Sequence, residues 1–132
     1  KLQKITETHP YYGEDSPWGK PAVPLEMVSV LTQYTSGHSG FRSRGPAIGL
    51  FAGQQIKMIN GPLLIGEDYL LDREIIALSE SRRTESNWIL SRVYRASDRE
   101  LVAEAILNSA TLKDSYANYD ADAAALGKDL SA

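Results

Sequence analysis

The residues best suited to acid–base chemistry lie near the start of the chain. Glu7, His9 and Tyr12 fall within one short segment, and Glu26 stands at the beginning of an apolar stretch. A carboxylate beside an imidazole can pass a proton, so Glu7 and His9 form one candidate proton-transfer pair. The alternative interpretation is structural. In that case His9 and Pro10 form a rigid turn, and Tyr11 and Tyr12 pack on the sheet with their hydroxyls at its rim.

Composition excludes several other chemistries. The sequence has no cysteine, which removes disulfides, thiolate metal sites and cysteine nucleophiles. Its two histidines, His9 and His38, do not stand at a metal-ligand spacing, so we expect no metal site. The net charge of -3 argues against a nucleic-acid partner or a membrane surface. No apolar run approaches the ~20 residues that span a bilayer. We therefore expect a cytoplasmic protein.

The chain length of 132 residues fits one domain over residues 1–132, with a tail over residues 114–132. Four of the six prolines lie between His9 and Pro24, which predicts an ordered, extended loop. The next segment, Pro24 to Thr35, predicts a helix with its proline in the first turn. Its apolar residues form an i, i+3 row: Leu25, Val28, Leu31 and Tyr34. Because few of its residues are polar, we expect this helix to be buried on most sides.

Four later segments predict strands by alternation or by continuous apolar character: 47–59, 69–79, 87–96 and 101–112. The last segment also has helix propensity. However, it follows a short turn at Ser97–Glu100 and must pair with the strand before it. A helix followed by consecutive strands predicts an α+β domain with an antiparallel sheet. Several strands are apolar on both faces, so the sheet should wrap the helix and meet another subunit.

Three motifs resemble the MaoC-like, (R)-specific enoyl-CoA hydratase family of hot-dog proteins. The segment HPYYGEDSPWGKPAVPLEMVSVL resembles the family's approach to its central helix, including the helix itself. The segment INGPLLIGEDYLLDREIIALSES resembles the family's proline turn and the long strand that follows it. The segment SNWILSRVYRASDRELVAEAILNSATL resembles the family's closing hairpin. The resemblance covers roughly residues 5–113 and depends on the order and spacing of the motifs. It implies a hot-dog fold, a curved antiparallel sheet wrapped around a central helix. The family's first strand would precede Lys1 or be missing.

The resemblance also implies a substrate class, thioesters of coenzyme A or acyl carrier protein, with no further cofactor. The family hydrates an enoyl group or dehydrates the hydroxyacyl product, using an Asp-x4-His pair. These two positions match Glu7 and Tyr12, and His9 stands where the family has Asn. Tyrosine, with a pKa of about 10, is a poor general base at neutral pH. Pro24 also removes one N–H from the helix start, where the family's amides hold the thioester oxygen.

Other residues gain a substrate-binding interpretation from the resemblance. Some hot-dog thioesterases carry an acidic residue on the central helix, which makes Glu26 a candidate nucleophile or base; otherwise it complements the helix dipole. Leu25, beside it, is a candidate substrate contact. His38, Arg42 and Arg44 lie in a glycine-rich loop. That loop is either a solvated connection or a place where the arginines bind the phosphates of a pantetheine carrier.

Three functions remain open at this point. The chain is a hydratase or dehydratase with altered acid–base residues, a non-catalytic hot-dog subunit paired with a catalytic one, or an acyl thioesterase that uses Glu26. Whether the isolated chain is an enzyme stays undecided. In each case we expect a homodimer, or a heterodimer with another hot-dog subunit, joined at a sheet edge.

Overall fold

The computed structural model describes residues 8–34 and 47–127. The elements in these ranges are η2 (Pro10–Tyr12), α1 (Leu25–Tyr34), β1 (Gly49–Met58), β2 (Tyr69–Glu80), β3 (Thr84–Arg95), β4 (Leu101–Leu112), η4 (Lys113–Ser115) and α2 (Tyr119–Ala125). The predicted helix and the four predicted strands are confirmed. Neither α-helix in the described ranges is long and apolar enough to cross a membrane.

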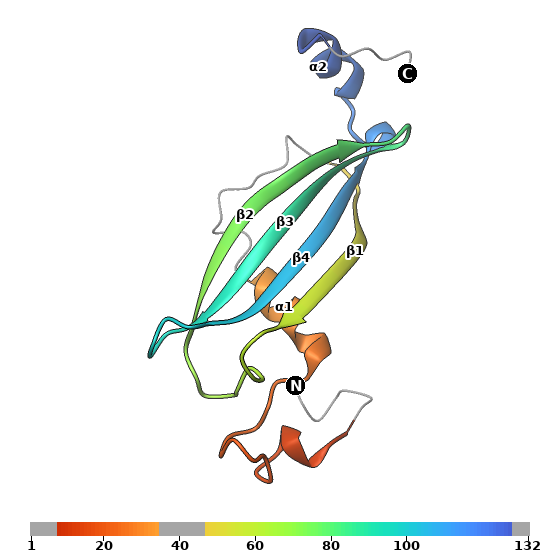
Figure 1. Ribbon diagram of the computed structural model, residues 1–132. Helices are drawn as coiled ribbons and strands as arrows, with labels where there is room; N and C mark the ends of the chain where they lie inside the picture. The colour runs from red at the N-terminus through yellow and green to blue at the C-terminus, as the bar shows by residue number, and fades with distance from the viewer. Residues whose placement is uncertain (1–7, 35–46, 128–132) are drawn as a thin grey trace.

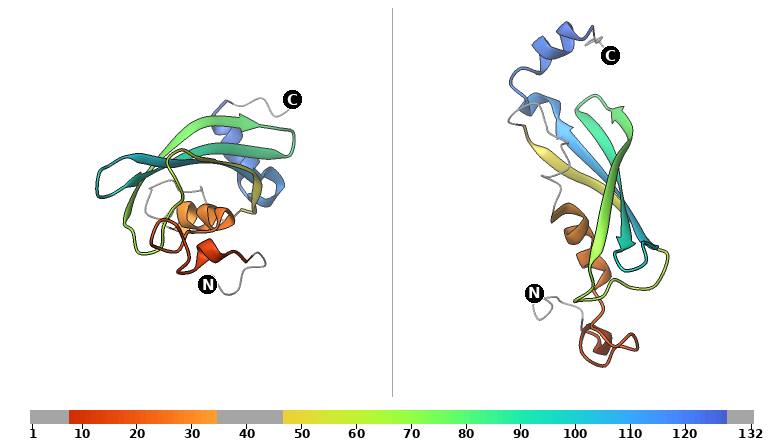
Figure 2. Two further views of the ribbon diagram at one scale, coloured as in Figure 1. Left: turned by 60° about the horizontal axis from the view of Figure 1, so that its bottom comes forward. Right: turned by 90° about the vertical axis from the view of Figure 1, so that its left-hand side faces the viewer.

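The four strands form one antiparallel sheet in the order β1-β4-β3-β2 (Figure 1). Pairing explains why the ambiguous segment 101–112 is a strand, since β4 is bonded to β1 on one side and to β3 on the other. Within the described residues, β1 and β2 are therefore the two edges of the sheet. The sheet curves over α1, which lies against its concave face (Figure 2). The α+β class and the antiparallel sheet are confirmed.

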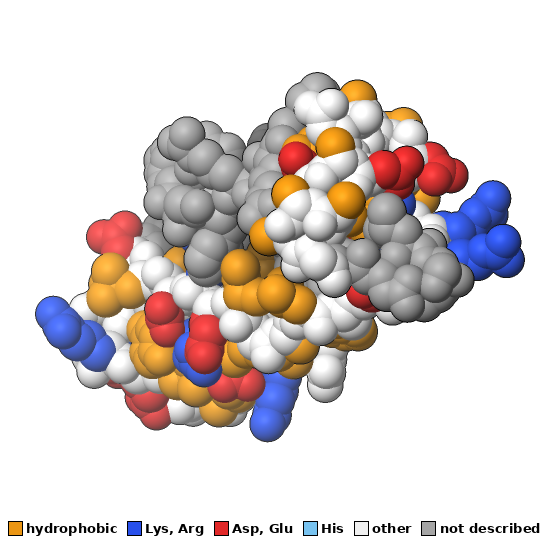
Figure 3. Space-filling model, turned by 90° about the horizontal axis from the view of Figure 1, so that it is seen from above, with side chains coloured by type: hydrophobic (Ala, Val, Ile, Leu, Met, Phe, Trp, Pro, Cys, Tyr) orange, Lys and Arg blue, Asp and Glu red, His pale blue; other side chains and the backbone are white. Residues whose placement is uncertain are grey.

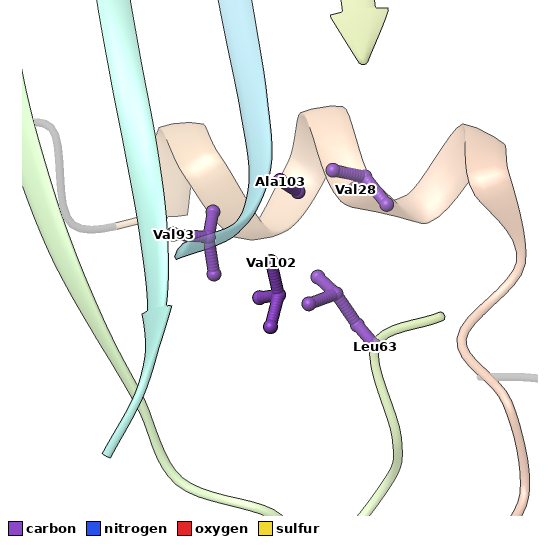
Figure 4. Close-up of a cluster of buried hydrophobic side chains, with 5 residues drawn as sticks. All are labelled: Val28, Leu63, Val93, Val102 and Ala103. Carbon is purple, nitrogen blue, oxygen red and sulfur yellow. The ribbon is translucent and has the colours of Figure 1, made fainter. Parts of the chain in front are cut away.

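The core joins α1 to one end of the sheet. Val28 is 1% exposed and packs with four buried side chains, Leu63, Val93, Val102 and Ala103 (Figure 4). Leu63 comes from the loop between β1 and β2, and the other three come from β3 and β4. The core is therefore a two-layer contact between one helix and one half of a sheet.

Only one side of α1 is buried, so the prediction of a helix enclosed on most sides is wrong. Val28 and Thr32 are buried, whereas Leu25 is 57% exposed and Leu31 is 42% exposed. A helix that lies on a single sheet buries the stripe facing that sheet, and here the stripe follows an i, i+4 spacing. In the i, i+3 row predicted from the sequence, Val28 therefore faces the sheet, whereas its neighbours in the row, Leu25 and Leu31, are exposed to solvent.

Side chains cross the concave face of the sheet in rows, because neighbouring strands are in register and side chains alternate between faces. Two rows meet α1 and are called the helix rows: Leu71, Val93, Ala103 and Met58, then Arg73, Ser91, Ala105 and Ile56. The next two are called the outer rows: Ile75, Ile89, Leu107 and Gln54, then Leu78, Asn87, Ser109 and Phe51.

Two bulges determine which side chains belong to the outer rows. The register shifts between Phe51 and Gly53 in β1, and between Ile75 and Ala77 in β2. One extra residue in an edge strand reverses the alternation beyond it. As a result Phe51 and Leu78 lie on the concave face, where an unbulged strand would direct them to the convex face.

Candidate functional site

The loop before α1 is anchored to the loop between β1 and β2. The Ala22 N–H donates to the Tyr11 carbonyl at 2.7 Å, and the Val23 N–H donates to the Leu63 carbonyl at 2.7 Å. A salt bridge of 2.9 Å joins Lys20 to Glu67. These contacts support the prediction of an ordered loop, but the loop is not extended throughout, because η2 and several turns occupy its first half. They hold the candidate residues His9 and Tyr12, and the beginning of α1, in a fixed relation to the sheet.

His9 has a structural role in the described chain. Its Nδ1 atom accepts a hydrogen bond from the Tyr11 N–H at 3.2 Å and caps η2. Its ring stands edge to face with Tyr11, at 4.5 Å between centroids, and lies 6.0 Å from the ring of Tyr12. His9 is exposed and Tyr12 is half-buried. This geometry favours the rigid turn over an acid–base group, although Glu7 lies outside the described residues and the Glu7–His9 pair is untested.

Glu26 and Leu25 both lie on the exposed side of α1, in its first turn. An acidic residue there complements the positive end of the helix dipole. A nucleophilic or basic role would be favoured by burial next to the acyl group, and a carboxylate open to water lacks that environment. The remaining candidates, His38, Arg42 and Arg44, lie outside the described residues. Their grouping with Leu25 therefore stays a prediction.

Arg73 fixes the end of α1 to the sheet, a role that the sequence analysis missed. Its Nε–H donates to the Thr32 carbonyl at 3.1 Å, and a second guanidinium N–H donates to the same oxygen. Thr32 is fully buried, and its hydroxyl donates to the Ser29 carbonyl at 3.0 Å. The last turn of a helix has carbonyls without helical partners, and a cation is well suited to them. Arg73 is therefore the clamp between the helix rows and α1.

The outer rows hold two amide side chains with unsatisfied hydrogen-bonding atoms. Gln54 Nε2 and Asn87 Oδ1 are shielded from water and have no hydrogen-bond partner. The sequence does carry a signal for them, because each interrupts the apolar alternation of its strand. Gln54 precedes Ile56 and Met58 in the alternation of β1, and Asn87 precedes Ile89 in that of β3. Buried polar atoms without partners are uncommon in native proteins and mark places worth a functional explanation.

Large apolar side chains remain open along the edges of the sheet. On β2 these are Leu70, Ile75, Ile76 and Leu78, which are 48%, 39%, 44% and 77% exposed. On β1, Leu50 is 43% exposed and Phe51 is 63% exposed. A view from above shows hydrophobic side chains at the surface beside acidic and basic ones (Figure 3). An exposed apolar edge strand is a typical place for another chain to pair.

The groups with shifted pKa values lie in surface ion pairs away from α1. Hydrogen bonds from Arg92 to Glu74 and Asp72 raise the pKa of the Arg92 guanidinium. A hydrogen bond from the Glu100 N–H lowers the pKa of the Asp98 carboxyl, and the Arg95 guanidinium lowers it further. Arg92 alternates to the convex face, and Asp98 lies in the turn between β3 and β4. In the described ranges, no group of three His, Cys, Asp or Glu residues could hold a metal ion.

Solved structures with the same fold come from bacteria and archaea. The chain matches the C-terminally truncated HadBC (3R-hydroxyacyl-ACP dehydratase) complex of Mycobacterium tuberculosis with a TM-score of 0.68 and 18% identity, covering 83% of this chain and 80% of that one. It matches a monoamine oxidase regulatory protein of Archaeoglobus fulgius with a TM-score of 0.62 and 15% identity, covering 80% and 72%.

A third match is the ChsH1-ChsH2 complex of Mycobacterium tuberculosis, with a TM-score of 0.56 and 17% identity, covering 85% of this chain and 74% of that one. No protein-family model and no curated protein sequence matches the chain. At these identities the likeness establishes the fold. The chain has the hot-dog fold of MaoC-like proteins, and the resemblance indicated by its sequence motifs is confirmed at that level.

Proposed function

We propose that this chain is a MaoC-like hot-dog subunit of the (R)-hydroxyacyl-thioester dehydratase and enoyl-CoA hydratase class. Its substrates are acyl chains carried by coenzyme A or acyl carrier protein. The observation that carries the proposal is the fold match to a 3R-hydroxyacyl-ACP dehydratase complex over 83% of the chain. The order of the three sequence motifs supports the same class independently, because it does not depend on the coordinates.

We propose further that the chain is the non-catalytic half of a pair. Hydration requires a base that takes a proton from water while the hydroxyl adds to C3 of the enoyl group, and an acid that protonates C2. Tyr12 stands where the family has its histidine, and His9 Nδ1 is already bonded to the Tyr11 N–H. In this account the partner supplies the acid–base pair, and this chain contributes binding surface.

The apolar edge of β2 supports a hot-dog partner. Leu70, Ile76 and Leu78 are open along a strand whose outer side has no neighbour among the described strands. Two of the three solved structures described above are complexes of two named proteins. Pairing β2 with the edge strand of a second hot-dog subunit would cover these side chains and extend the sheet.

Turnover of crotonyl-CoA tests the proposal. The chain is assayed alone and together with the hot-dog subunit that copurifies with it, and enoyl absorbance and free thiol are followed in parallel. We expect no reaction with the isolated chain and loss of enoyl absorbance with the pair. Loss of absorbance with the chain alone would show that it carries its own acid–base group. Thiol release that Glu26→Gln abolishes would instead identify a thioesterase.

A further inference from the structure

Gln54 and Asn87 leave an unused donor and an unused acceptor on the concave face of the sheet. Gln54 Nε2 and Asn87 Oδ1 are both shielded from water without a partner. Leaving such an atom unsatisfied is unfavourable, and a bound group that supplies the missing hydrogen bond removes that cost. An unused donor and an unused acceptor on one face are therefore complementary to a ligand group that offers both functions.

The two side chains stand on opposite sides of β4. Gln54 of β1 is in register with Leu107, and Asn87 of β3 is in register with Ser109. The Cα atoms of Gln54 and Asn87 are separated by two strand spacings of about 4.8 Å across the sheet and by two residues along the strands. Together these place the two Cα atoms about 12 Å apart. Both side chains project from the concave face, since each lies in one of the outer rows. A group bound between them therefore lies across β4, over the outer rows.

A secondary amide fits this separation. Its oxygen and nitrogen are about 2.3 Å apart, and two hydrogen bonds of about 2.9 Å extend its reach to about 8 Å. That length lies within the range that two amide side chains can span when their Cα atoms are about 12 Å apart on one face of a sheet. The amide oxygen would accept from Gln54, and the amide N–H would donate to Asn87.

The surroundings of the two amides favour an aliphatic chain. Within the outer rows, Phe51 is 63% exposed, Leu78 is 77% exposed and Ile75 is 39% exposed. These side chains form an apolar margin on both sides of the amide pair, in the edge strands β1 and β2. A ligand with one amide between methylene groups would satisfy the polar centre and cover the apolar margin at the same time.

We propose that Gln54 and Asn87 bind a secondary amide within a flexible aliphatic chain, held across β4 on the concave face. This inference rests on the proposed function, because a coenzyme A or acyl-carrier thioester has secondary amides in its pantetheine arm. An acyl group that carries an amide of its own is a second source of the same chemistry.

The test compares Gln54→Met and Asn87→Leu with the control Asn108→Leu. Asn108 Oδ1 is likewise shielded without a partner. However, Asn108 alternates to the convex face, opposite Trp88. Each substitution removes an unsatisfied amide and keeps a similar volume. The dissociation constant is measured by calorimetry for coenzyme A, for crotonyl-CoA and for an acyl-CoA with an amide in its acyl group, using the chain with its copurifying subunit.

We expect Gln54→Met and Asn87→Leu each to weaken coenzyme A binding about tenfold, the effect of one lost hydrogen bond. Asn108→Leu should leave binding unchanged. Circular dichroism and the melting temperature verify folding, and we expect all three variants to be as stable as the wild type or more so. A loss seen only with the amide-bearing acyl chain would assign the site to the acyl group, within the same proposal.

Three results would overturn the inference. Unchanged affinities in both variants, with a wild type that binds crotonyl-CoA, would refute the amide site and leave the proposed function intact. Weaker subunit association with unchanged ligand affinity would assign the two amides to a peptide segment of the partner. A wild-type complex that neither binds nor hydrates crotonyl-CoA would remove the proposed function as well.

Discussion

The helix rows and the outer rows lie on the same face of the same sheet, yet they differ in what covers them. Val93, Ala103 and Val28 close one half of the face with apolar contacts. In the other half, Phe51 and Leu78 stay exposed around two unsatisfied amides. A protein that needed the sheet only for stability would pack both halves alike. The difference shows that one half of the face holds the fold together, and it supports our proposal that the other half binds a ligand or a partner.

The largest expected effect separates the two halves by stability. Leu63, 2% exposed, packs against the helix rows, so Leu63→Ala should lower the free energy of unfolding by about 3 kcal/mol through lost burial and a cavity. The matched change Leu78→Ala, at a side chain 77% exposed, should alter it by about 0.5 kcal/mol or less. Urea unfolding followed by circular dichroism measures both. Equal losses would contradict the division.

The next effect concerns the clamp at the border of the helix rows. Arg73→Met removes two hydrogen bonds to the Thr32 carbonyl and should cost about 2 kcal/mol. Amides in the last turn of α1 should then exchange with solvent faster, whereas those of β3 keep most of their protection. Arg82→Met, in the exposed turn between β2 and β3, is the control. Exchange that rises equally in α1 and β3 would mean global destabilisation rather than a local clamp.

A smaller effect tests the apolar edge of the outer half. Ile76 is 44% exposed and lies at the bulge between the two outer rows on β2. A lysine there protects an edge strand from pairing, so Ile76→Lys should weaken subunit association about tenfold or more. Sedimentation equilibrium measures the association. Leu126→Lys, at an exposed leucine of the C-terminal segment, should leave it unchanged. A wild type that stays monomeric at micromolar concentration would refute this interface.

The smallest effect is electrostatic and lies in the turn next to the helix rows. The Glu100 N–H and then Arg95 lower the pKa of Asp98 below its ordinary value. A carboxyl with a lowered folded-state pKa stabilises the protein above its unfolded pKa, and that contribution is lost as pH falls through the folded value. The wild type should therefore be slightly more stable than Asp98→Asn at pH 7. The difference should shrink below about pH 4. Thermal unfolding across that range measures it, and a difference that grows in acid would contradict the assignment.

The sequence was sufficient to predict the elements and their order. Alternation in 47–59, 69–79 and 87–96 predicted strands that the structure contains, and the short turn at Ser97–Glu100 correctly outweighed the helix propensity of 101–112. These features depend on local periodicity and short connections, which are visible in one sequence. The three motifs added the hot-dog fold, which the structural matches support.

Tertiary arrangement was harder to predict. Which side of α1 is buried depends on how the helix lies on the sheet, so Leu25 and Leu31 were wrongly placed in the core. The bulge at Ile76 has no glycine or proline to mark it, and it moves Leu78 onto the concave face. Gln54 and Asn87 gain their meaning only from the register that places them on either side of β4. Each miss involves contacts between segments distant in the sequence.

The most direct measurement follows the side-chain amide signals of the chain by NMR during a titration with crotonyl-CoA. The central claim is that the thioester ligand binds over the outer rows of the concave face. The account predicts that the NH2 signals of Gln54 and Asn87 shift in proportion to bound ligand, while the Asn108 signals on the convex face stay in place. Shifts confined to Asn108, or no shift at any of the three while ligand binds, would contradict it.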